Sequence, residues 1–246
     1  MSSLPVRALS TLYSACALPV FCALFVVATL LAIVVPRLEW RRSLTHALAR
    51  LAMAALGLRV RVLGGERLPP GACVVAANHS SYLDGPLLKA CLPPRFSFVI
   101  KREAADTPLV GFLLRRIGSE FVDRASRGGR QRDARRVLER AEQGQSLVFF
   151  PEGTFDEVPG LKRFHGGAFA AAVRAGVPVV PVAIRGARRA MPNGAILVRP
   201  GIVDVEILDP IGIDRERPDA DALRDATRCR IAARIEEPDL LVARRD

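Results

Sequence analysis

The sequence has very little histidine and few aromatic residues. Three histidines occur among 246 residues, and phenylalanine, tryptophan and tyrosine together make up 6% of the chain. Hydrophobic residues nevertheless account for 50% of it, so alanine, valine and leucine have to build the core. This composition is typical of an α/β domain and unlike an aromatic-rich β-sandwich. The length allows one large domain, or one domain with an anchor.

Closely spaced cysteine pairs are also absent. The five cysteines are scattered, at Cys16, Cys22, Cys73, Cys91 and Cys229. Their odd number and the lack of a C-x-x-C pair argue against a disulfide framework and against a thiolate zinc site, and they favour a reducing compartment. Cys73 and Cys91 lie in apolar segments, so we expect them to be small hydrophobic core residues.

Acidic residues are too few to balance the arginines, which leaves a formal net charge of +11. Nucleic acid and an anionic membrane surface are the two partners that such a charge favours. A genome rich in GC, which enriches arginine and alanine everywhere, is a third explanation. No strand carries the aromatic and basic face used for base stacking, so the sequence predicts no nucleic-acid partner.

One long segment contains no charge at all. It covers residues 12–35 and exceeds the roughly 20 residues needed to cross a bilayer as a helix. A signal peptide is the alternative, but only Arg7 precedes the segment and "PRLEWRR" follows it instead of a small-residue cleavage site. The arginines after the segment are Arg37, Arg41, Arg42 and Arg50. By the positive-inside rule they predict a chain at the cell inner membrane, with its bulk on the cytoplasmic face.

Residues 40–57 have leucines and alanines at helical spacing with arginines among them. This pattern predicts an amphipathic helix on the membrane surface, with an ordinary surface helix of the domain as the alternative. Together with residues 12–35 it would form a hairpin dipping into one leaflet, or follow a full span; the sequence does not separate the two. We therefore predict a membrane anchor over residues 1–57 and one domain over residues 58–246.

Short apolar runs alternate with helical patterns after residue 57. The predicted strands cover residues 59–63, 72–78, 96–100, 119–123, 146–150, 177–184, 196–200 and 203–208. The predicted helices cover residues 86–90, 109–117, 130–143, 167–175 and 224–235. The alternation predicts an α/β fold with a mostly parallel central sheet flanked by helices, preceded by an N-terminal membrane-associated helical element.

Three polar segments follow predicted strands, at residues 78–84, 118–124 and 149–155. Ligands of open α/β sheets bind outside the carboxyl ends of the strands, so these segments point to one site. In the first, Asp84 follows His79 by five positions. The carboxylate would fix the imidazole tautomer, and the other ring nitrogen would then remove a proton from a hydroxyl. Alternatively, Asp84 is the N-cap of the helix predicted at residue 86. A metal site would lack a second histidine or cysteine.

The other two segments supply groups that suit a phosphorylated alcohol. Arg124 and Lys101 stand at strand ends, where cations bind phosphate. Glu152 would accept hydrogen bonds from ligand hydroxyls, and Gly153 would let the backbone approach the ligand closely. A solvated surface charge at Arg124 and a turn residue at Glu152 are the alternatives.

This set of residues resembles the glycerolipid acyltransferase family, typified by 1-acylglycerol-3-phosphate acyltransferase and including lysophospholipid acyltransferases. Four motifs of that family occur in order over residues 70–185. The matching residues are Asn78, His79 and Asp84; Gly118, Phe121, Val122, Asp123 and Arg124; the unbroken Phe-Pro-Glu-Gly-Thr at residues 150–154; and a Val-Pro-rich strand at residues 177–182.

The resemblance implies that His79, oriented by Asp84, deprotonates the free hydroxyl of a lysophospholipid. The alkoxide would attack the thioester of acyl-CoA or acyl-carrier protein without an acyl-enzyme, and no cofactor or metal is implied. The preferred acceptor is 1-acylglycerol-3-phosphate, giving phosphatidate. The resemblance assigns substrate binding to Asn78, Lys101, Arg124, Glu152, Gly153 and Thr154. Ser80 and Ser81 are interpreted as turn residues and not as nucleophiles.

Two departures from the family pattern concern charge. Phe155 and Asp156 stand where many relatives have Arg-Ser, and a lysine frequent further downstream is missing. We hypothesise that Lys162, Arg163 or His165 supplies the missing charge. An acyltransferase for another lysolipid, a lipid hydrolase using the same histidine and aspartate, and a non-enzymatic basic membrane-binding module remain alternatives.

Overall fold

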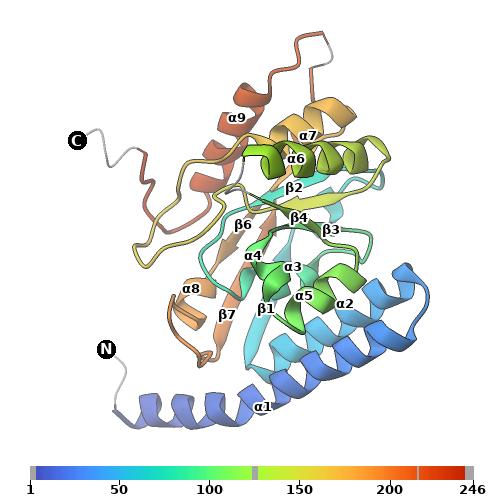
Figure 1. Ribbon diagram of the computed structural model, residues 1–246. Coiled ribbons are helices and arrows are strands. Elements are labelled where there is room, and N and C mark those ends of the chain that lie inside the picture. The colour runs from blue at the N-terminus through green and yellow to red at the C-terminus, as the bar shows by residue number, and fades with distance from the viewer. Residues whose placement is uncertain (1–3, 124–126, 215, 242–246) are drawn as a thin grey trace.

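A seven-stranded sheet forms the centre of the protein, with helices on both of its faces (Figure 1). The computed structural model describes residues 4–123, 127–214 and 216–241, without the side chains of residues 4–11, 14 and 127–130. The strands are β1 (Leu58–Leu63), β2 (Val74–Ala77), β3 (Ser97–Lys101), β4 (Glu120–Val122), β5 (Leu147–Phe149), β6 (Val179–Arg185) and β7 (Gly201–Ile207). Their order across the sheet is β1-β7-β6-β2-β5-β3-β4.

The predicted mostly parallel sheet is confirmed. β6, β2, β5, β3 and β4 run parallel to one another, whereas β7 is antiparallel to β6 and parallel to β1. The strand predicted at residues 196–200 is wrong, because this segment is an irregular connection. Val198 is buried there, which explains its apolar pattern, and Pro200 has no amide hydrogen to donate to a neighbouring strand.

The helices are α1 (Leu4–Val34), α2 (Leu38–Ala55), α3 (Asp84–Cys91), α4 (Glu103–Asp106), α5 (Val110–Arg116), α6 (Arg127–Glu142), α7 (Gly167–Ala175), α8 (Ala187–Ala190) and α9 (Ala220–Ala232), with a 3₁₀ turn η1 (Gly65–Arg67).

The central strand β2 is apolar at every position because both of its faces are buried. Val74 and Ala76 belong to the core that includes residues of α7 and α9, and Val75 and Ala77 to the core that includes residues of α2 and α3. A central parallel strand buried on both faces needs apolar residues at every position.

The N-terminal helix α1 contacts the rest of the protein at points between Tyr13 and Ile33. The hydroxyl of Tyr13 donates to the carbonyl of Ala55 at 3.0 Å. Ala17 joins the same core as the sheet, and Ala28 packs with Leu113 of α5. Figure 1 shows α1 along the base of the molecule, beside α2. The helix begins at Leu4, earlier than the predicted residue 12. It shares a hydrophobic core with the domain. The predicted division into a membrane anchor over residues 1–57 and a catalytic domain after it stays a prediction.

The opposite side of α1 and α2 is apolar and exposed. The exposed large apolar residues on this side are Leu12, Val20, Val26, Val27, Leu30, Ile33 and Val34 on α1, and Leu38, Trp40, Leu44 and Leu51 on α2. The segment Ala15–Val34 is long and apolar enough to cross a membrane by length and composition. Only 22% of its most apolar stretch is buried within the protein, so most of its surface is available to another apolar medium.

Two of the four arginines used to predict the membrane orientation have partners inside the protein. The guanidinium of Arg42 donates to the carbonyl of Ile117 at 2.9 Å and to the hydroxyl of Ser97, and that of Arg41 donates to the carbonyl of Arg116. Burial lowers the pKa of Arg42. These two residues connect α2 to the region of β3 and α5. The predicted orientation of the chain in the membrane therefore depends on Arg37 and Arg50, which are exposed. This orientation stays a prediction.

Candidate active site

The predicted site residues follow strands whose carboxyl ends lie at one edge of the sheet. His79 follows β2, residues 150–154 follow the adjacent β5, and Lys101 ends β3, the next strand along. Neighbouring strands are about 4.8 Å apart, so Lys101 lies two strand positions from the histidine. Arg124, which follows β4, lies outside the described residues.

The structure brings His79 and Asp84 together. Nδ1 of His79 lies 2.8 Å from Oδ2 of Asp84, and the same oxygen accepts the amides of Ser80 and Ser81 at 2.7 and 2.9 Å. Asp84 is fully buried. An ionised carboxylate is an acceptor only, so with Asp84 in that form Nδ1 would donate the proton and Nε2 would keep its lone pair. This is the arrangement that a general base requires.

Asp84 does not act as the N-cap that the sequence offered as an alternative. Helix α3 begins at Asp84 itself, and no side chain caps its first turn. The carboxylate turns back to the residues before the helix. Within the described part of the chain, its Oδ1 is buried without a hydrogen-bond partner. The interpretation as a partner of His79 therefore stands without the capping role.

The two serines of the first motif have the contacts of turn residues. The hydroxyl of Ser81 donates to the carbonyl of Met191 at 2.9 Å and accepts the amide of Leu83 at 3.2 Å. Ser80 is buried, and its amide hydrogen bonds to Asp84. Neither hydroxyl is hydrogen-bonded to His79, so the geometry does not activate a serine nucleophile.

Glu152 reaches from the third motif to the backbone of the first. Its Oε1 accepts the amide of His79 at 2.7 Å, and its Oε2 accepts the amide of Lys162 at 2.8 Å. Burial raises the pKa of Glu152 to about 7, and the two amide hydrogen bonds partly oppose that rise. Gly153 closes the turn after β5 through its amide and the carbonyl of Phe150, at a φ of 81° that favours glycine.

Asn78 connects β2 to β6. Its amide nitrogen donates to the carbonyl of Ile184 at 3.0 Å, and its oxygen accepts the amide of the same residue at 2.7 Å. Like Glu152, Asn78 is almost completely buried. The contacts in the structure are therefore with backbone groups. The predicted contacts of Asn78, Glu152, Lys101, Gly153 and Thr154 with a substrate stay predictions.

Aromatic side chains surround the imidazole, which the sequence reasoning missed. Phe150 stacks on His79 with ring centroids 4.3 Å apart, and Phe155 meets the imidazole at 4.7 Å and an angle of 70°. Tyr82 in turn meets Phe155 at 4.8 Å. The signal was present in "FFPEGTF", where phenylalanines flank the third motif, but nothing in the sequence indicated that they face His79.

Lys162 is not free to replace the missing charge. Its Nζ forms an ion pair with Asp156 and donates to the carbonyl of Thr154 at 3.1 Å. Arg163 is exposed. The backbone amide of His165 donates to the carbonyl of Pro151 at 2.8 Å. Of the three candidates in our hypothesis, Lys162 therefore has its charge balanced within the protein.

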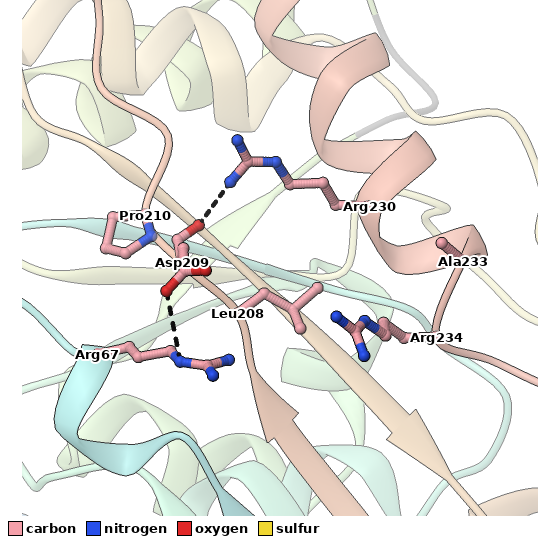
Figure 2. Close-up of a pocket in the computed structure, with 7 residues that line it drawn as sticks. All are labelled: Arg67, Leu208, Asp209, Pro210, Arg230, Ala233 and Arg234. Atoms are coloured by element: carbon pink, nitrogen blue, oxygen red, sulfur yellow. Dashed lines mark hydrogen bonds and ion pairs between the residues drawn. The ribbon is translucent and has the colours of Figure 1, made fainter.

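A separate surface hollow of about 390 Å³ lies at the other end of the molecule (Figure 2). It follows β7, which is antiparallel to β6, so it opens at the edge opposite to His79. Its charged lining is Arg67, Asp209, Arg230 and Arg234, and it contains none of the predicted site residues. Among the described residues there is also no group of three or more metal-ligating side chains.

Comparison with known proteins identifies a family and several relatives. The profile of the family described as Acyltransferase matches residues 59–185. A lyso-ornithine lipid O-acyltransferase of Pseudomonas aeruginosa is 39% identical over 67% of this chain and 60% of its own length. A 1-acyl-sn-glycerol-3-phosphate acyltransferase of Chlamydomonas reinhardtii is 31% identical over 91% of this chain and 67% of its own length.

A solved structure shares the fold. The 1-acyl-sn-glycerophosphate acyltransferase of Thermotoga maritima superposes with a TM-score of 0.73 at 23% sequence identity, over 93% of this chain and 97% of that one. The match confirms the fold, including the mostly parallel sheet with flanking helices. The chain spans about three fifths of the length of the Pseudomonas relative.

Proposed function

The chain belongs to the acyltransferase family, and on that premise we propose that it transfers a fatty acyl group from a thioester to the free hydroxyl of a lysophospholipid. The observation that carries the proposal is the 2.8 Å contact between His79 and the buried carboxylate of Asp84. The leading acceptor is 1-acylglycerol-3-phosphate, giving phosphatidate, because relatives with that name align over most of this chain. The donor is acyl-CoA or acyl-carrier protein.

In the proposed chemistry His79 acts first as a base and then as an acid. Nε2 of His79 takes the proton of the acceptor hydroxyl while the oxygen attacks the thioester carbonyl. The tetrahedral intermediate collapses, the carbon–sulfur bond breaks, and the imidazolium returns the proton to the leaving thiolate. Asp84 holds the ring through Nδ1, and its carboxylate stabilises the imidazolium. The products are the new ester and the free thiol of the carrier.

The headgroup of the acceptor is proposed to bind along the same sheet edge. Lys101 at the end of β3 would hold a phosphate two strand positions from β2, and Arg124, outside the described residues, is the second proposed phosphate ligand. The backbone of Gly153 and Thr154 after β5 lies between Lys101 and the histidine in the strand order.

A lyso-ornithine lipid is the second candidate acceptor. The Pseudomonas relative that is 39% identical carries that name. The ion pair between Lys162 and Asp156 favours testing it, because this cation beside the third motif is already neutralised. A loop with less free positive charge discriminates less strongly in favour of a phosphate.

We also propose that α1 lies in one leaflet of the cytoplasmic membrane instead of crossing it. The inner side of α1 contacts the protein from Tyr13 to the carbonyl of Ala32, which accepts Nε of Arg116 at 2.8 Å. A helix that is attached to the domain along this length has no segment left to cross the bilayer. Its exposed apolar side then faces the acyl chains, where the acceptor lipid resides.

The test is an assay of the purified protein with acyl-CoA and acyl-carrier protein as donors. The acceptors are 1-acylglycerol-3-phosphate, other lysophospholipids and lyso-ornithine lipid. We expect release of the free thiol that depends on acceptor, and loss of at least about 100-fold in His79→Ala. His46→Ala is the matched control, since His46 contacts the carbonyl of Lys89 away from the site. Full transfer by His79→Ala would overturn the mechanism.

A further inference from the structure

The imidazole of His79 contacts two aromatic rings, those of Phe150 and Phe155. Phe150 covers it by stacking, and Phe155 lies against it at 4.7 Å. The His79 side chain is only 19% exposed as a result of its surroundings. Tyr82 covers Phe155 from outside, and its own side chain is largely exposed. The order from the base outwards is therefore His79, Phe155, Tyr82.

The loop that carries Phe155 is fastened on both sides of the ring. On one side, Nζ of Lys162 binds the carbonyl of Thr154 at 3.1 Å. On the other, Nη1 of Arg188 binds the carbonyl of Asp156 at 2.8 Å, and Arg188 is itself held by Glu237 at 3.0 Å. Lys162 belongs to the same connection between β5 and α7, whereas Arg188 belongs to α8 and Glu237 follows α9, so the position of Phe155 does not depend on the loop alone. A ring held this way is a fixed wall of the site and not a mobile cover.

From this geometry we propose that Phe155, supported by Tyr82, keeps water away from His79 and so determines whether the acyl group goes to a lipid hydroxyl or to water. The inference rests on the proposed function, because it concerns the same base and the same thioester. Phe155 touches the imidazole directly, whereas Tyr82 acts through Phe155 as a positioning residue. A site that excludes water suppresses the hydrolysis of its activated substrate.

The two competing reactions use the same base. In transfer, Nε2 takes the proton of the lipid hydroxyl, and its oxygen forms the new ester as the carbon–sulfur bond breaks. In hydrolysis, Nε2 takes a proton from water, the hydroxide attacks the same carbonyl, and the products are a free fatty acid and the thiol. Removing the phenyl ring of Phe155 leaves space beside the imidazole of His79. A water molecule needs such a space and a polar partner, and the imidazole nitrogen is that partner.

The experiment measures free fatty acid and acylated lipid from one radiolabelled acyl thioester in the same reaction. We expect the ratio of hydrolysis to transfer to rise about tenfold in Phe155→Ala, and by a smaller factor in Tyr82→Ala. Phe155→Leu should remain near the wild-type ratio, because leucine keeps apolar bulk next to the ring. Val158→Ala, an exposed residue of the same loop, is the control and should leave the ratio unchanged.

Each outcome decides between the possibilities. In the double variant His79→Ala with Phe155→Ala, the extra hydrolysis should disappear, which shows that it uses the same base. Equal losses of transfer and hydrolysis in Phe155→Ala, with a folded protein by thermal denaturation, would overturn the inference and leave the proposed function intact. If Phe155→Ala does not fold, Tyr82→Ala decides: an unchanged ratio of hydrolysis to transfer in Tyr82→Ala overturns the inference. Acyl release that never depends on acceptor in the wild type would instead overturn the proposed function.

Discussion

The carboxylate of Glu152 accepts the backbone amide of His79 at 2.7 Å, which joins the third motif to the first. Its other oxygen accepts the amide of Lys162 at 2.8 Å. Glu152 therefore sets the position of the residue that carries the base, and at the same time closes the loop that carries Phe155. A glutamate that fixes two backbone segments acts on catalysis through their positions.

Glu152→Gln should lower both stability and turnover. Glutamine keeps one acceptor oxygen but turns an NH₂ group towards the second amide, so one buried amide loses its partner. We expect the free energy of unfolding to fall by about 1–3 kcal/mol, and kcat to fall more than KM rises. Chemical denaturation and steady-state kinetics measure these two effects. Glu157→Gln, an exposed residue nearby, should change neither; equal effects of the two variants would contradict the assignment.

The pH dependence of stability should report the same residue. Burial raises the pKa of Glu152 from 4.5 to about 7, so the folded state holds a proton that the unfolded state loses. The stabilisation is complete below about pH 4.5 and is lost as the pH rises through about 7. Relative to the wild type, Glu152→Gln should therefore be less stable by a larger margin at pH 5 than at pH 8. A margin independent of pH in urea denaturation would show that the carboxyl does not titrate in this range.

Asp84→Asn should remove most of the activity while keeping the fold. The side-chain NH₂ group of asparagine can donate to Nδ1, which would place the ring proton on Nε2 and remove the base. We expect kcat to fall by about 10²–10⁴, with a smaller change in KM. Asp225→Asn, on the exposed side of α9, is the control with the same chemical change. Retained activity in Asp84→Asn would mean that tautomer control is not essential.

The sequence predicted the sheet, its direction and the pairing of His79 with Asp84, because these depend on local patterns and spacing. It did not predict that Phe155 meets the imidazole, since this contact depends on how the segment after β5 folds towards the segment after β2. It also missed that Asn78 and Glu152 hold backbone groups. Short motifs identify which residues gather at a site, but the hydrogen-bond partners of these residues depend on the tertiary structure.

Lys89→Met should stabilise the protein near neutral pH. Within the described chain, the amine of Lys89 on α3 forms no ion pair with a carboxylate, and burial together with the nearby Arg42 lowers its pKa to about 8. A lysine with a lowered pKa destabilises the fold fully below about pH 8, and this cost disappears as the pH rises towards 10.5. We expect a gain on the order of 2 kcal/mol at pH 7 that shrinks at pH 10. Arg59→Met on exposed β1 should give no such gain.

The exposed apolar side of α1 leads to a last prediction, on membrane binding. Val27 and Leu30 are both largely exposed on α1, and the double variant with lysine at both positions should bind anionic vesicles at least about tenfold more weakly. The reason is that each lysine removes apolar area from the bilayer contact and adds a charge to it. The matched control places lysines at Val62 and Leu63, two exposed apolar residues at the end of β1. Cosedimentation of wild type and both variants compares them directly. Equal loss in both double variants would indicate general adhesion to the vesicles, whereas loss only in the α1 variant assigns the membrane contact to this helix.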